Sequence, residues 1–581
     1  MQQQAEEVAL ERPTYSYGPF IPGTLPDSLE RAGLQAALRS NGRCVPSDAL
    51  DYYGRQIAPT LAKVADYDVE IAKVQAILTR MSEDRSILQY HADGCGSVSA
   101  PIRRLPDDML LEIFHLCSPL QQPTYYDDWK EYHKEDPMSK LQRATPRYRY
   151  LLQLAQVCAS WRGLIMDSPA LWAKIETDFT HLVTRKEYGA SEPILAVEIF
   201  AVSRVFLGRS AIAPLQIQLR SRHFGLLPYG PVLDCMVQQS HRWTHAKIWA
   251  DSPSEDFAAF ASVRGNLPVL ENLHVSNLRD DCNFFEFAPR LTELTLEEPI
   301  APHPKLPWGQ IQTLSYAQLY SDELNDALSH LSRCPQLTSL AFLRLYISDG
   351  VDPVILPPLI SDIGSLAFGF ILESHHHTES PIVSELLGCF TLRRAHTLRF
   401  ETEESPLPWS HTAFLALCSR SSLHDTLRTL EIDNLTISGA QLLECLSALP
   451  RLEALSISDP NHYPSSPEKF LITDPLLRGL TLEPDCEDLV PHLHTFDCKS
   501  FMQFKASSYL DFIASRVGPG RNAAGPFQSS ILHFRDIQVD PLLVQGLNEL
   551  VRRQELRFRL ECDRLKSRWP MAESVLEDNP S

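Results

Sequence analysis

The feature that most constrains this chain is a short apolar unit that recurs through its second half. The unit reads Leu-x-x-Leu-x-apolar, and a proline stands shortly before it in the clearest copies. The apolar residues of these copies are Leu270, Leu273 and Val275; Leu291, Leu294 and Leu296; Leu337, Leu340 and Phe342; and Leu452, Leu455 and Ile457. On a strand, residues two apart point to the same face, so each unit has one apolar face. A unit this short cannot bury that face alone, and the units must therefore stack on one another.

Weaker copies fill the gaps between the clear ones. They lie at Ile311 and Leu314; Leu398 and Phe400; Leu427, Leu430 and Ile432; Leu477, Leu480 and Leu482; and Leu493 and Phe496. Most successive copies are 16 to 32 residues apart. Leucine-rich repeats have an L-x-x-L-x-L core and a period of about 20–29 residues, so these units resemble an irregular version of them. We expect a strand at each copy.

Helical patterns occur between the strands. They cover residues 323–332, 411–418 and 439–449. The last has apolar residues at i, i+3, i+4 and i+7 and is followed by Pro450, where a helix cannot continue. Further upstream, residues 214–219 and 246–249 read as strands and residues 230–243 as a helix. The sequence therefore predicts an α/β solenoid of about ten to twelve units over 190–560, with a C-terminal tail at 561–581.

Three short amphipathic helices are expected upstream of this array. Pro106 suits a first helical position, and Leu110, Ile113, Phe114 and Cys117 then share one face. Residues 151–166 give a second helix, with Leu151, Leu154, Cys158 and Trp161 on one face, and a third follows Ser168-Pro169. A charged, aromatic insert at 121–150 separates the first two helices. So small a helical unit is marginal alone, which favours a partner.

These residues resemble a known module. Ile102-x-x-Leu105-Pro106 with Leu110 and Ile113-Phe114, then Val157-Cys158-x-x-Trp161-Arg162, then Ser168-Pro169-x-Leu171-Trp172, is similar to the F-box. With the leucine-rich array behind it, the chain resembles the F-box/leucine-rich-repeat proteins common in mushroom-forming fungi. The resemblance implies an α/β chain with a helical F-box at 100–180 and a solenoid at 190–560. The insert is a departure from the F-box pattern.

The resemblance also implies a function. F-box/leucine-rich-repeat proteins are substrate-receptor subunits of cullin-type ubiquitin ligases, in which the F-box docks a Skp-type adaptor and the repeats bind a protein client. The residues carried over to the adaptor contact are Leu105, Pro106, Leu110, Ile113, Leu154, Val157, Cys158 and Trp161. Some of them could instead be core residues. Outward positions on the strands are candidates for the client contact: His274, Thr295, Arg399, Glu431 and Ser456.

The N-terminal part is expected to be a loose leader over 1–54 and an amphipathic helix over 55–92. Its apolar residues recur at steps of three and four: Leu61, Val64, Tyr67, Ile71, Val74, Leu78 and Met81. The segment 93–97, with two glycines, is expected to break the helix. The helix could form a short coiled coil or pack on its own domain. Fewer than three heptads favour the second use.

Charge and motif content narrow the function further. The net charge is −20, from 53 Lys and Arg against 73 Asp and Glu, and this argues against nucleic-acid binding. No apolar stretch is long enough to predict a membrane span. We find no nucleophile, metal or phosphate motif, and His375–His377 has no partner at metal-site spacing, so no cofactor, metal or catalytic residue is expected. Thirteen scattered cysteines without a CxxC favour a cytoplasmic or nuclear location. The alternatives to a ligase receptor are an adaptor-binding scaffold and an enzyme.

Overall fold

A computed structural model describes most of the chain. The described residues are 25, 28–39, 46–117, 146–178, 192–221, 230–250, 256–297, 301–347, 356–372, 381–403, 405–461, 470–483, 488–517, 527, 529–534, 541–554 and 557–562. They divide into two compact units, Met1–Leu110 and Leu111–Ser581, and each unit is considered by itself.

The first unit is helical. It contains α1 (Ser28–Arg39), α2 (Ser47–Ser99), the 3₁₀ helix η1 (Pro101–Arg104) and the start of α3 (Asp107–Leu116). Helix α2 has 53 residues and passes through Gly94 and Gly96, so the expected break at 93–97 is wrong. Glycine lowers helix propensity by only about 1 kcal/mol and still makes the backbone hydrogen bond. The expected loose leader is also wrong in part, because α1 and the first turns of α2 lie within residues 1–54.

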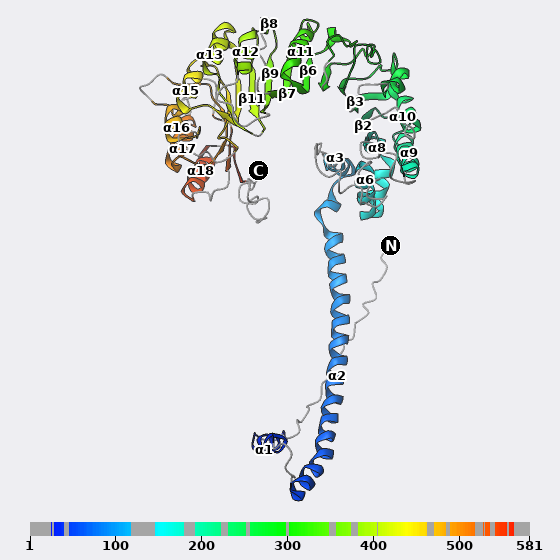
Figure 1. The fold of residues 1–581 in the computed structure, drawn as a ribbon. Helices are drawn as coiled ribbons and strands as arrows, with labels where there is room; N and C mark the ends of the chain where they lie inside the picture. Colours follow the sequence, from blue (N-terminus) through cyan, green and yellow to red (C-terminus); the bar gives the residue numbers. More distant parts are fainter. Residues whose placement is uncertain are drawn as a thin grey trace, which may run out of the picture. The chain divides into compact units, whose positions relative to one another are not determined.

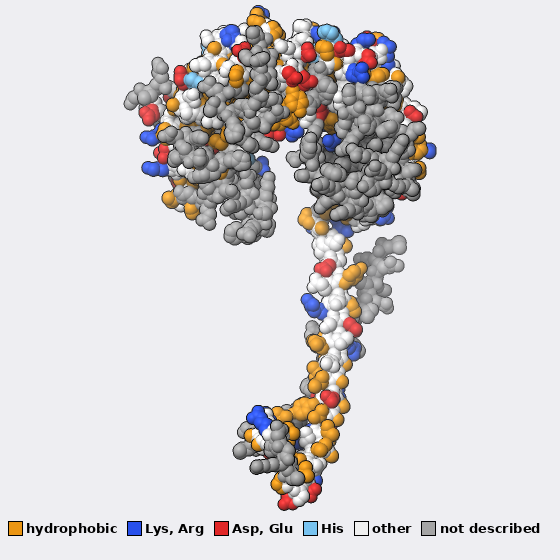
Figure 2. Space-filling view, viewed as in Figure 1, with side chains coloured by type: hydrophobic (Ala, Val, Ile, Leu, Met, Phe, Trp, Pro, Cys, Tyr) orange, Lys and Arg blue, Asp and Glu red, His pale blue; other side chains and the backbone are white. Residues whose placement is uncertain are grey.

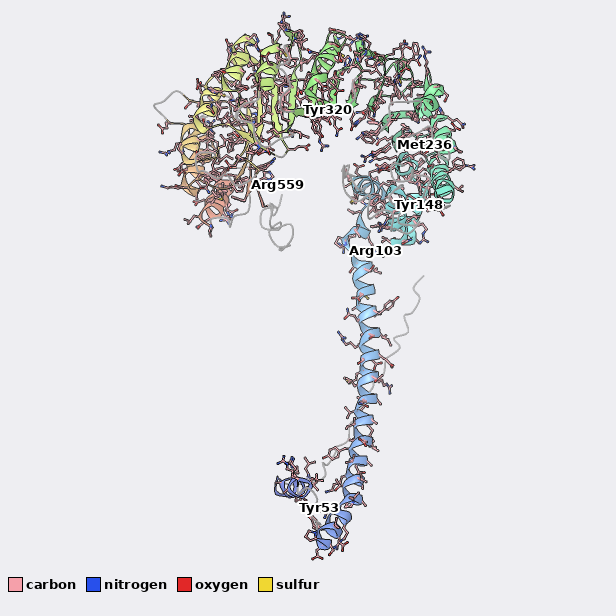
Figure 3. The ribbon with its side chains drawn as sticks, viewed as in Figure 1. Tyr53, Arg103, Tyr148, Met236, Tyr320 and Arg559 are labelled. Carbon is pink, nitrogen blue, oxygen red and sulfur yellow. The ribbon has the colours of Figure 1, made fainter. Side chains whose placement is uncertain are left out.

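The apolar face of α2 is exposed. No residue of this helix is buried, and its large apolar side chains include Ile71 at 53% exposure and Leu78 at 64%. In Figure 3 the side chains stand out along the whole length of the helix. The favoured use, packing of the helix on its own domain, therefore buries none of its side chains among the described residues of this unit.

The second unit is built on a parallel sheet. Its described strands form one 14-stranded sheet in the order β1-β2-β3-β4-β5-β6-β7-β9-β11-β13-β15-β16-β17-β18, and two short pairs, β8 with β10 and β12 with β14, lie beside it. The strands of the sheet are β1 (Lys174–Asp178), β2 (Leu215–Ser221), β3 (Trp243–Ala250), β4 (Asn272–Ser276), β5 (Glu293–Glu297), β6 (Thr313–Tyr320), β7 (Ser339–Ile347), β9 (Ser365–Leu372), β11 (Thr397–Thr402), β13 (Thr429–Asp433), β15 (Ala454–Ser458), β16 (Thr495–Ser500), β17 (Ser529–Phe534) and β18 (Arg557–Cys562). The short strands are β8 (Leu359–Ser361), β10 (Phe390–Leu392), β12 (Leu407–Pro408) and β14 (Leu435–Thr436).

The helices of this unit alternate with the strands. They are α6 (Pro146–Val157), α7 (Ala159–Asp167), α8 (Pro169–Trp172), α9 (Glu192–Arg209), α10 (Gly230–Val237), α11 (Leu324–Leu331), α12 (Pro381–Cys389), α13 (His411–Arg420), α14 (Leu423–Thr426), α15 (Gly439–Ser447), α16 (Asp474–Leu480), α17 (Ala506–Arg516) and α18 (Pro541–Gln554), with 3₁₀ helices η2 (Ser240–Arg242), η3 (Asp256–Val263), η4 (Trp308–Gln310) and η5 (Ser321–Glu323). Figure 1 shows the helices on one side of the row of strands. The chain is therefore a helical region followed by a strand-rich, mixed α/β region.

The apolar repeat explains how the strands align. Equivalent leucines are in register along the sheet, as in the pairs Leu273–Leu294, Leu398–Leu430 and Leu430–Leu455. The second inward row holds stacked aromatic rings: Tyr316, Phe342, Phe368 and Phe400 lie 5.4–5.7 Å from ring to ring. Stacking buries on each strand the apolar face that no unit could bury alone.

Most of the expected strands and helices are present. Eight of the nine apolar copies form strands of the sheet, and the helices expected at 323–332, 411–418 and 439–449 are α11, α13 and α15. The copy at 477–482 is wrong, because Leu477 and Leu480 lie on helix α16. Leucines three apart fit a helix face as well as the repeat unit, and Pro475 in the first turn favours the helix. The sheet also begins earlier than expected, at β1, before residue 190.

Three arginines join successive helices. Arg242, Arg420 and Arg516 each donate to backbone carbonyls at or just after the C-terminal end of an earlier helix. Arg516 is fully buried, and its guanidinium donates to the carbonyl oxygens of Leu480 and Val490 at 2.6 and 3.0 Å. Burial lowers the pKa of Arg516 to about 10. The last carbonyls of a helix have no partner within it, and these side chains supply one.

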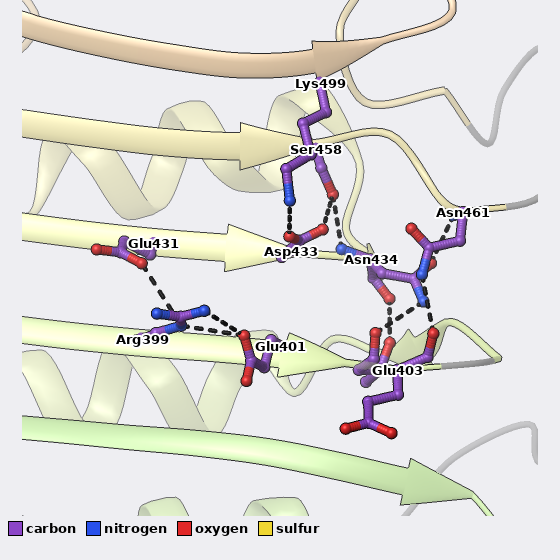
Figure 4. Close-up of polar contacts among 10 residues, drawn as sticks. Arg399, Glu401, Glu403, Glu431, Asp433, Asn434, Ser458, Asn461 and Lys499 are labelled. Atoms are coloured by element: carbon purple, nitrogen blue, oxygen red, sulfur yellow. Dashed lines mark hydrogen bonds and ion pairs between the residues drawn. The ribbon is translucent and has the colours of Figure 1, made fainter. Parts of the chain in front are cut away.

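Buried asparagine turns the chain after a strand. Asn434 follows β13 with φ of 58°, and its backbone N–H donates to Ser458 Oγ at 2.7 Å. Its side chain donates to the Thr402 carbonyl at 3.0 Å and accepts from the Asn461 N–H at 2.7 Å (Figure 4). Asn277 follows β4 with φ of 55°. Asparagine tolerates this left-handed conformation better than most residues, and its amide can satisfy neighbouring backbone groups.

Replacing Asn434 tests this turn. We expect Asn434→Ala to lower the free energy of local unfolding by about 3 kcal/mol, because two backbone partners are lost and alanine is strained at positive φ. Asn434→Gly removes the same bonds without the strain and is expected to cost about 1 kcal/mol less. Hydrogen exchange of the β13 amides measures both. Equal losses of unfolding free energy in the two variants would show that backbone strain at positive φ does not contribute.

Candidate functional site

Helix α3 has two apolar faces rather than one. Leu110 and Phe114 are buried, at 5% and 1% exposure. Met109 and Leu116 are 52% and 74% exposed, and Ile113 is half-buried. Positions 109, 113 and 116 have the i, i+4, i+7 spacing of a single helix face. The helix therefore contributes one row to the core and presents a second apolar row to solvent.

Aromatic contacts hold the second half of α3 against the following helices. The rings of Phe114 and Trp161 meet edge to face with centroids 4.8 Å apart. The Tyr150 hydroxyl, on α6, donates to the Phe114 carbonyl oxygen at 2.9 Å. Phe114 thus links α3 to both α6 and α7, although its partners Tyr150 and Trp161 lie 36 or more residues further along the chain.

The expected single helix over 151–166 is wrong, because the chain breaks at Cys158. Helix α6 ends at Val157, and Cys158 is extended, with φ of −160°, before α7 begins. Its Sγ accepts the Trp161 N–H at 3.4 Å and so caps α7. Arg162 adds a bond from Nε to the Ala155 carbonyl oxygen at 3.1 Å. Because of this break, Cys158 and Trp161 do not continue the helix face of Leu151 and Leu154.

The third expected helix is present as α8, directly after Ser168 with Pro169 at its first position. Trp172 is 1% exposed, and its Nε1 donates to the Ile165 carbonyl oxygen at 2.7 Å. Phe206 of α9 meets its ring at 5.1 Å and also approaches Tyr148 of α6, which Figure 3 labels. Residues 146–150 of the expected insert are the first turn of α6, and 118–145 lie outside the described residues.

The predicted adaptor-contact residues differ in exposure. Pro106 and Val157 are exposed, the latter at 59%. Five others of the predicted residues are partly exposed: Leu105, Ile113, Leu154, Cys158 and Trp161. Leu110 is buried, at 5% exposure. A helix face spans more than one row of side chains, and the sequence pattern alone did not separate the inner row from the outer one.

Two exposed apolar residues of α3 were not among the residues predicted from the sequence. Met109 and Leu116 lie on the same outward row as Ile113 and are more exposed than it is. Their spacing of four and then three residues was visible in the sequence, but the stripe through Leu110 and Phe114 has the same spacing. Only the burial of that second stripe tells them apart.

A second candidate surface is the face of the sheet opposite the helices, which we call the open face. Residues with outward positions on neighbouring strands are in register on it, as in the pairs His274–Thr295 and Arg399–Glu431. Figure 4 shows Arg399 and Glu431 in front of the strands and the helices behind them. All five candidate client residues lie on this face and are at least partly exposed: His274, Thr295, Arg399, Glu431 and Ser456.

Two polar clusters organise the open face. On β3–β5, buried Glu297 accepts from Trp249 Nε1 at 2.5 Å and from His274 Nε2 at 3.0 Å. On β11 and β13, Arg399 bonds Glu401 at 2.5 Å and lies 3.5 Å from Glu431; Figure 4 draws both contacts. These partners hold the side chains in fixed orientations, and a fixed orientation lowers the entropic cost of binding.

The described residues contain no cluster of three or more His, Cys, Asp or Glu side chains able to hold a metal ion. His375–His377 lie outside that part of the chain. Burial raises the pKa of Cys389 and Cys418 to about 12, which makes these thiols weak nucleophiles. Within the ranges the structure covers, no helix has both the length and the apolar character required to cross a bilayer.

Comparison with known families identifies the helical module. Residues 102–177 match the F-box-like family. The match covers α3, α6, α7 and α8 and ends inside β1. F-box domains are typically non-catalytic adaptor modules. No curated protein matches the chain.

The helical module should depend on Phe114. We expect Phe114→Ala to lower the free energy of local unfolding by about 3–5 kcal/mol, because it removes a fully buried ring that contacts Trp161. Leu116→Ala, on the same helix and exposed, is the control and should change it by less than about 0.5 kcal/mol. Hydrogen exchange in 107–116 and 146–167 reports both. Similar exchange in the two variants would contradict the packing described.

Proposed function

We propose that this protein is the substrate-receptor subunit of a Skp-cullin-F-box ubiquitin ligase. In this proposal the F-box-like module docks a Skp-type adaptor, which connects it to a cullin, and the strand-rich region binds a protein client. The observation that carries the proposal is the match of 102–177 to the F-box-like family, on a module whose helices expose apolar side chains.

The exposed apolar side chains support a docking role. Met109, Leu116 and Val157 are all more than half exposed in a module of four short helices. Met109 and Leu116 form one exposed apolar row with Ile113, and contiguous exposed apolar surface is typical of interaction sites. A few large apolar residues also supply most of the binding energy in typical interfaces. We assign the adaptor contact to these three residues together with Pro106, Ile113 and Trp161.

The strand-rich region is assigned to the client. We propose that it is an irregular leucine-rich-repeat solenoid, as in the F-box/leucine-rich-repeat proteins of mushroom-forming fungi. Sequence-ordered parallel strands, leucines in register and a helix after most strands support this. An array of this kind offers a long surface of outward strand residues, and here that surface is the open face.

This role requires no catalytic chemistry from the chain. We propose that it is not an enzyme, uses no cofactor, binds neither nucleic acid nor a membrane, and acts in the cytoplasm or nucleus. The net charge of −20 supports the first of these binding exclusions. An adaptor-bound scaffold outside any ligase is the alternative, and it differs only in failing to recruit the cullin.

A matched pair of variants tests the adaptor contact. Val157→Asp places a charge on an exposed residue of the F-box-like module, and we expect it to weaken adaptor binding at least about 30-fold, since it desolvates a carboxylate in the interface. Val197→Asp, on α9 at 66% exposure, makes the same change outside the module and should bind normally. Calorimetric titration with purified adaptor measures both. Unchanged binding by Val157→Asp would refute the contact.

The open face is tested through client capture. Trp249→Ala and Arg399→Glu disrupt its two clusters, and Arg204→Glu on α9 is a charge reversal away from it. Proximity labelling with and without proteasome inhibition should enrich clients that appear only under inhibition. We expect the open-face variants to lose at least about half of these while keeping adaptor and cullin. Full retention of the clients would contradict the assignment, and loss of the cullin from the wild-type chain would favour the scaffold.

A further inference from the structure

The exposed face of α2 repeats with a coiled-coil period. Taking Val64 as position a of a heptad, the a positions are Val64, Ile71, Leu78 and Arg85, and the d positions are Tyr67, Val74, Met81 and Leu88. Seven of these eight are apolar or aromatic. The spacing of 3.5 residues is the one that keeps a single seam facing a partner helix over several turns.

Most of this seam is exposed among the described residues of its unit. Its side chains are exposed to 49% at Val64, 46% at Val74 and 48% at Met81, and none in α2 is buried. Figure 2 shows apolar side chains spaced along the helix surface. A single helix in water gains most of its stability from burying an apolar face. A 53-residue helix with this seam therefore requires a partner of matching length and period.

A second copy of the same chain supplies that partner. We propose that α2 pairs with α2 of another copy as a parallel, two-stranded coiled coil over residues 64–88, a seam about 36 Å long. The proposal is independent of the adaptor and client assignments. Two features specify the partner and its direction.

The first feature is the shape of the seam residues. Val64 and Ile71 place β-branched side chains at successive a positions, as two-stranded parallel coiled coils do. Arg85 at a later a position is costly to bury in a larger core but is tolerated in a dimer, where it reaches the edge of the seam. In a parallel pair it also lies next to Asp84 of the other copy, at the preceding g position.

The second feature is charge complementarity across the seam. In a parallel dimer a g residue faces the e residue five positions later on the other helix. Lys63 occupies a g position and Asp68 the e position that it would face, so the symmetric dimer contains this pair twice. An antiparallel pair would instead bring g to g and e to e, and the Lys63–Asp68 pair would be lost. Helix α1 lies against α2 near Tyr53, before the seam begins, and leaves residues 64–88 open (Figure 3).

Parallel pairing would also determine what the dimer presents. Helix α2 ends at Ser99, and the F-box-like match begins at 102. Two parallel helices would therefore carry two F-box-like modules at the same end of the coiled coil. The resulting assembly would offer two adaptor-docking modules and two open faces.

A matched pair of valine substitutions tests the seam in the full-length chain. Val74→Glu changes a d position, and Val69→Glu makes the same change at the outward f position, which is 56% exposed. We expect the wild type and Val69→Glu to sediment as dimers at 10 μM, and Val74→Glu to dissociate with a dissociation constant raised at least about 100-fold. Because the two substitutions have the same effect on helix propensity, a difference between them reports the seam. A monomeric wild type, or dimers of equal stability in both variants, would overturn the proposal.

The direction is tested by cross-linking. The d positions after Met81 are Leu88 and then Cys95, which is exposed on α2. In a parallel pair the two copies of Cys95 therefore face each other. A short bismaleimide should then link the two thiols by addition, giving a covalent dimer that Cys95→Ser abolishes. An antiparallel pair would place the two thiols tens of ångströms apart, and a dimer that is not cross-linked through Cys95 would overturn the parallel arrangement. Mixing Lys63→Glu with Asp68→Lys should favour the heterodimer, in which both opposed pairs are attractive.

Discussion

No strand of the large sheet is stable alone, and this dependence on neighbours organises the second unit. Most strands have one face of leucine, isoleucine or aromatic side chains, which is buried beside the equivalent residues of neighbouring strands and under the helices on that side of the sheet. Because the strands are parallel, each must be followed by a crossover before the next begins, and most crossovers contain a helix. On the described strands the opposite face holds many partly exposed residues, and these make up the open face.

The F-box-like module is continuous with this sheet. Its match ends within β1, which pairs in parallel with β2, and buried Trp172 contacts Phe206 of α9. The module therefore packs on α9, the helix that follows β1, and is not a separate domain joined by a linker. A small helical unit that buries part of its surface in this way can still expose apolar residues such as Val157 and Leu116 for a partner.

The sequence predicted the strands well because their constraint is local. Leu294, Leu296 and their equivalents are two apart on short strands, and one copy suffices to recognise the pattern. It failed where two patterns share a spacing: Leu477 and Leu480 suit a helix as well as a strand, and the two rows of α3 differ only in which one is buried. The break at Cys158 was missed because extended backbone at one residue has no periodic signal. The length of α2 was underestimated because Gly94 and Gly96 were given too much weight as helix breakers.

The central claim is that the helical module docks the adaptor while the open face stays free to bind the client. Hydrogen–deuterium exchange of the full-length chain, with and without a saturating Skp-type adaptor, tests it most directly. The account predicts slower exchange in peptides from 107–116 and 146–167 and unchanged exchange in strands β4 to β16. Protection of the sheet instead, or no protection of the helical module, would contradict it.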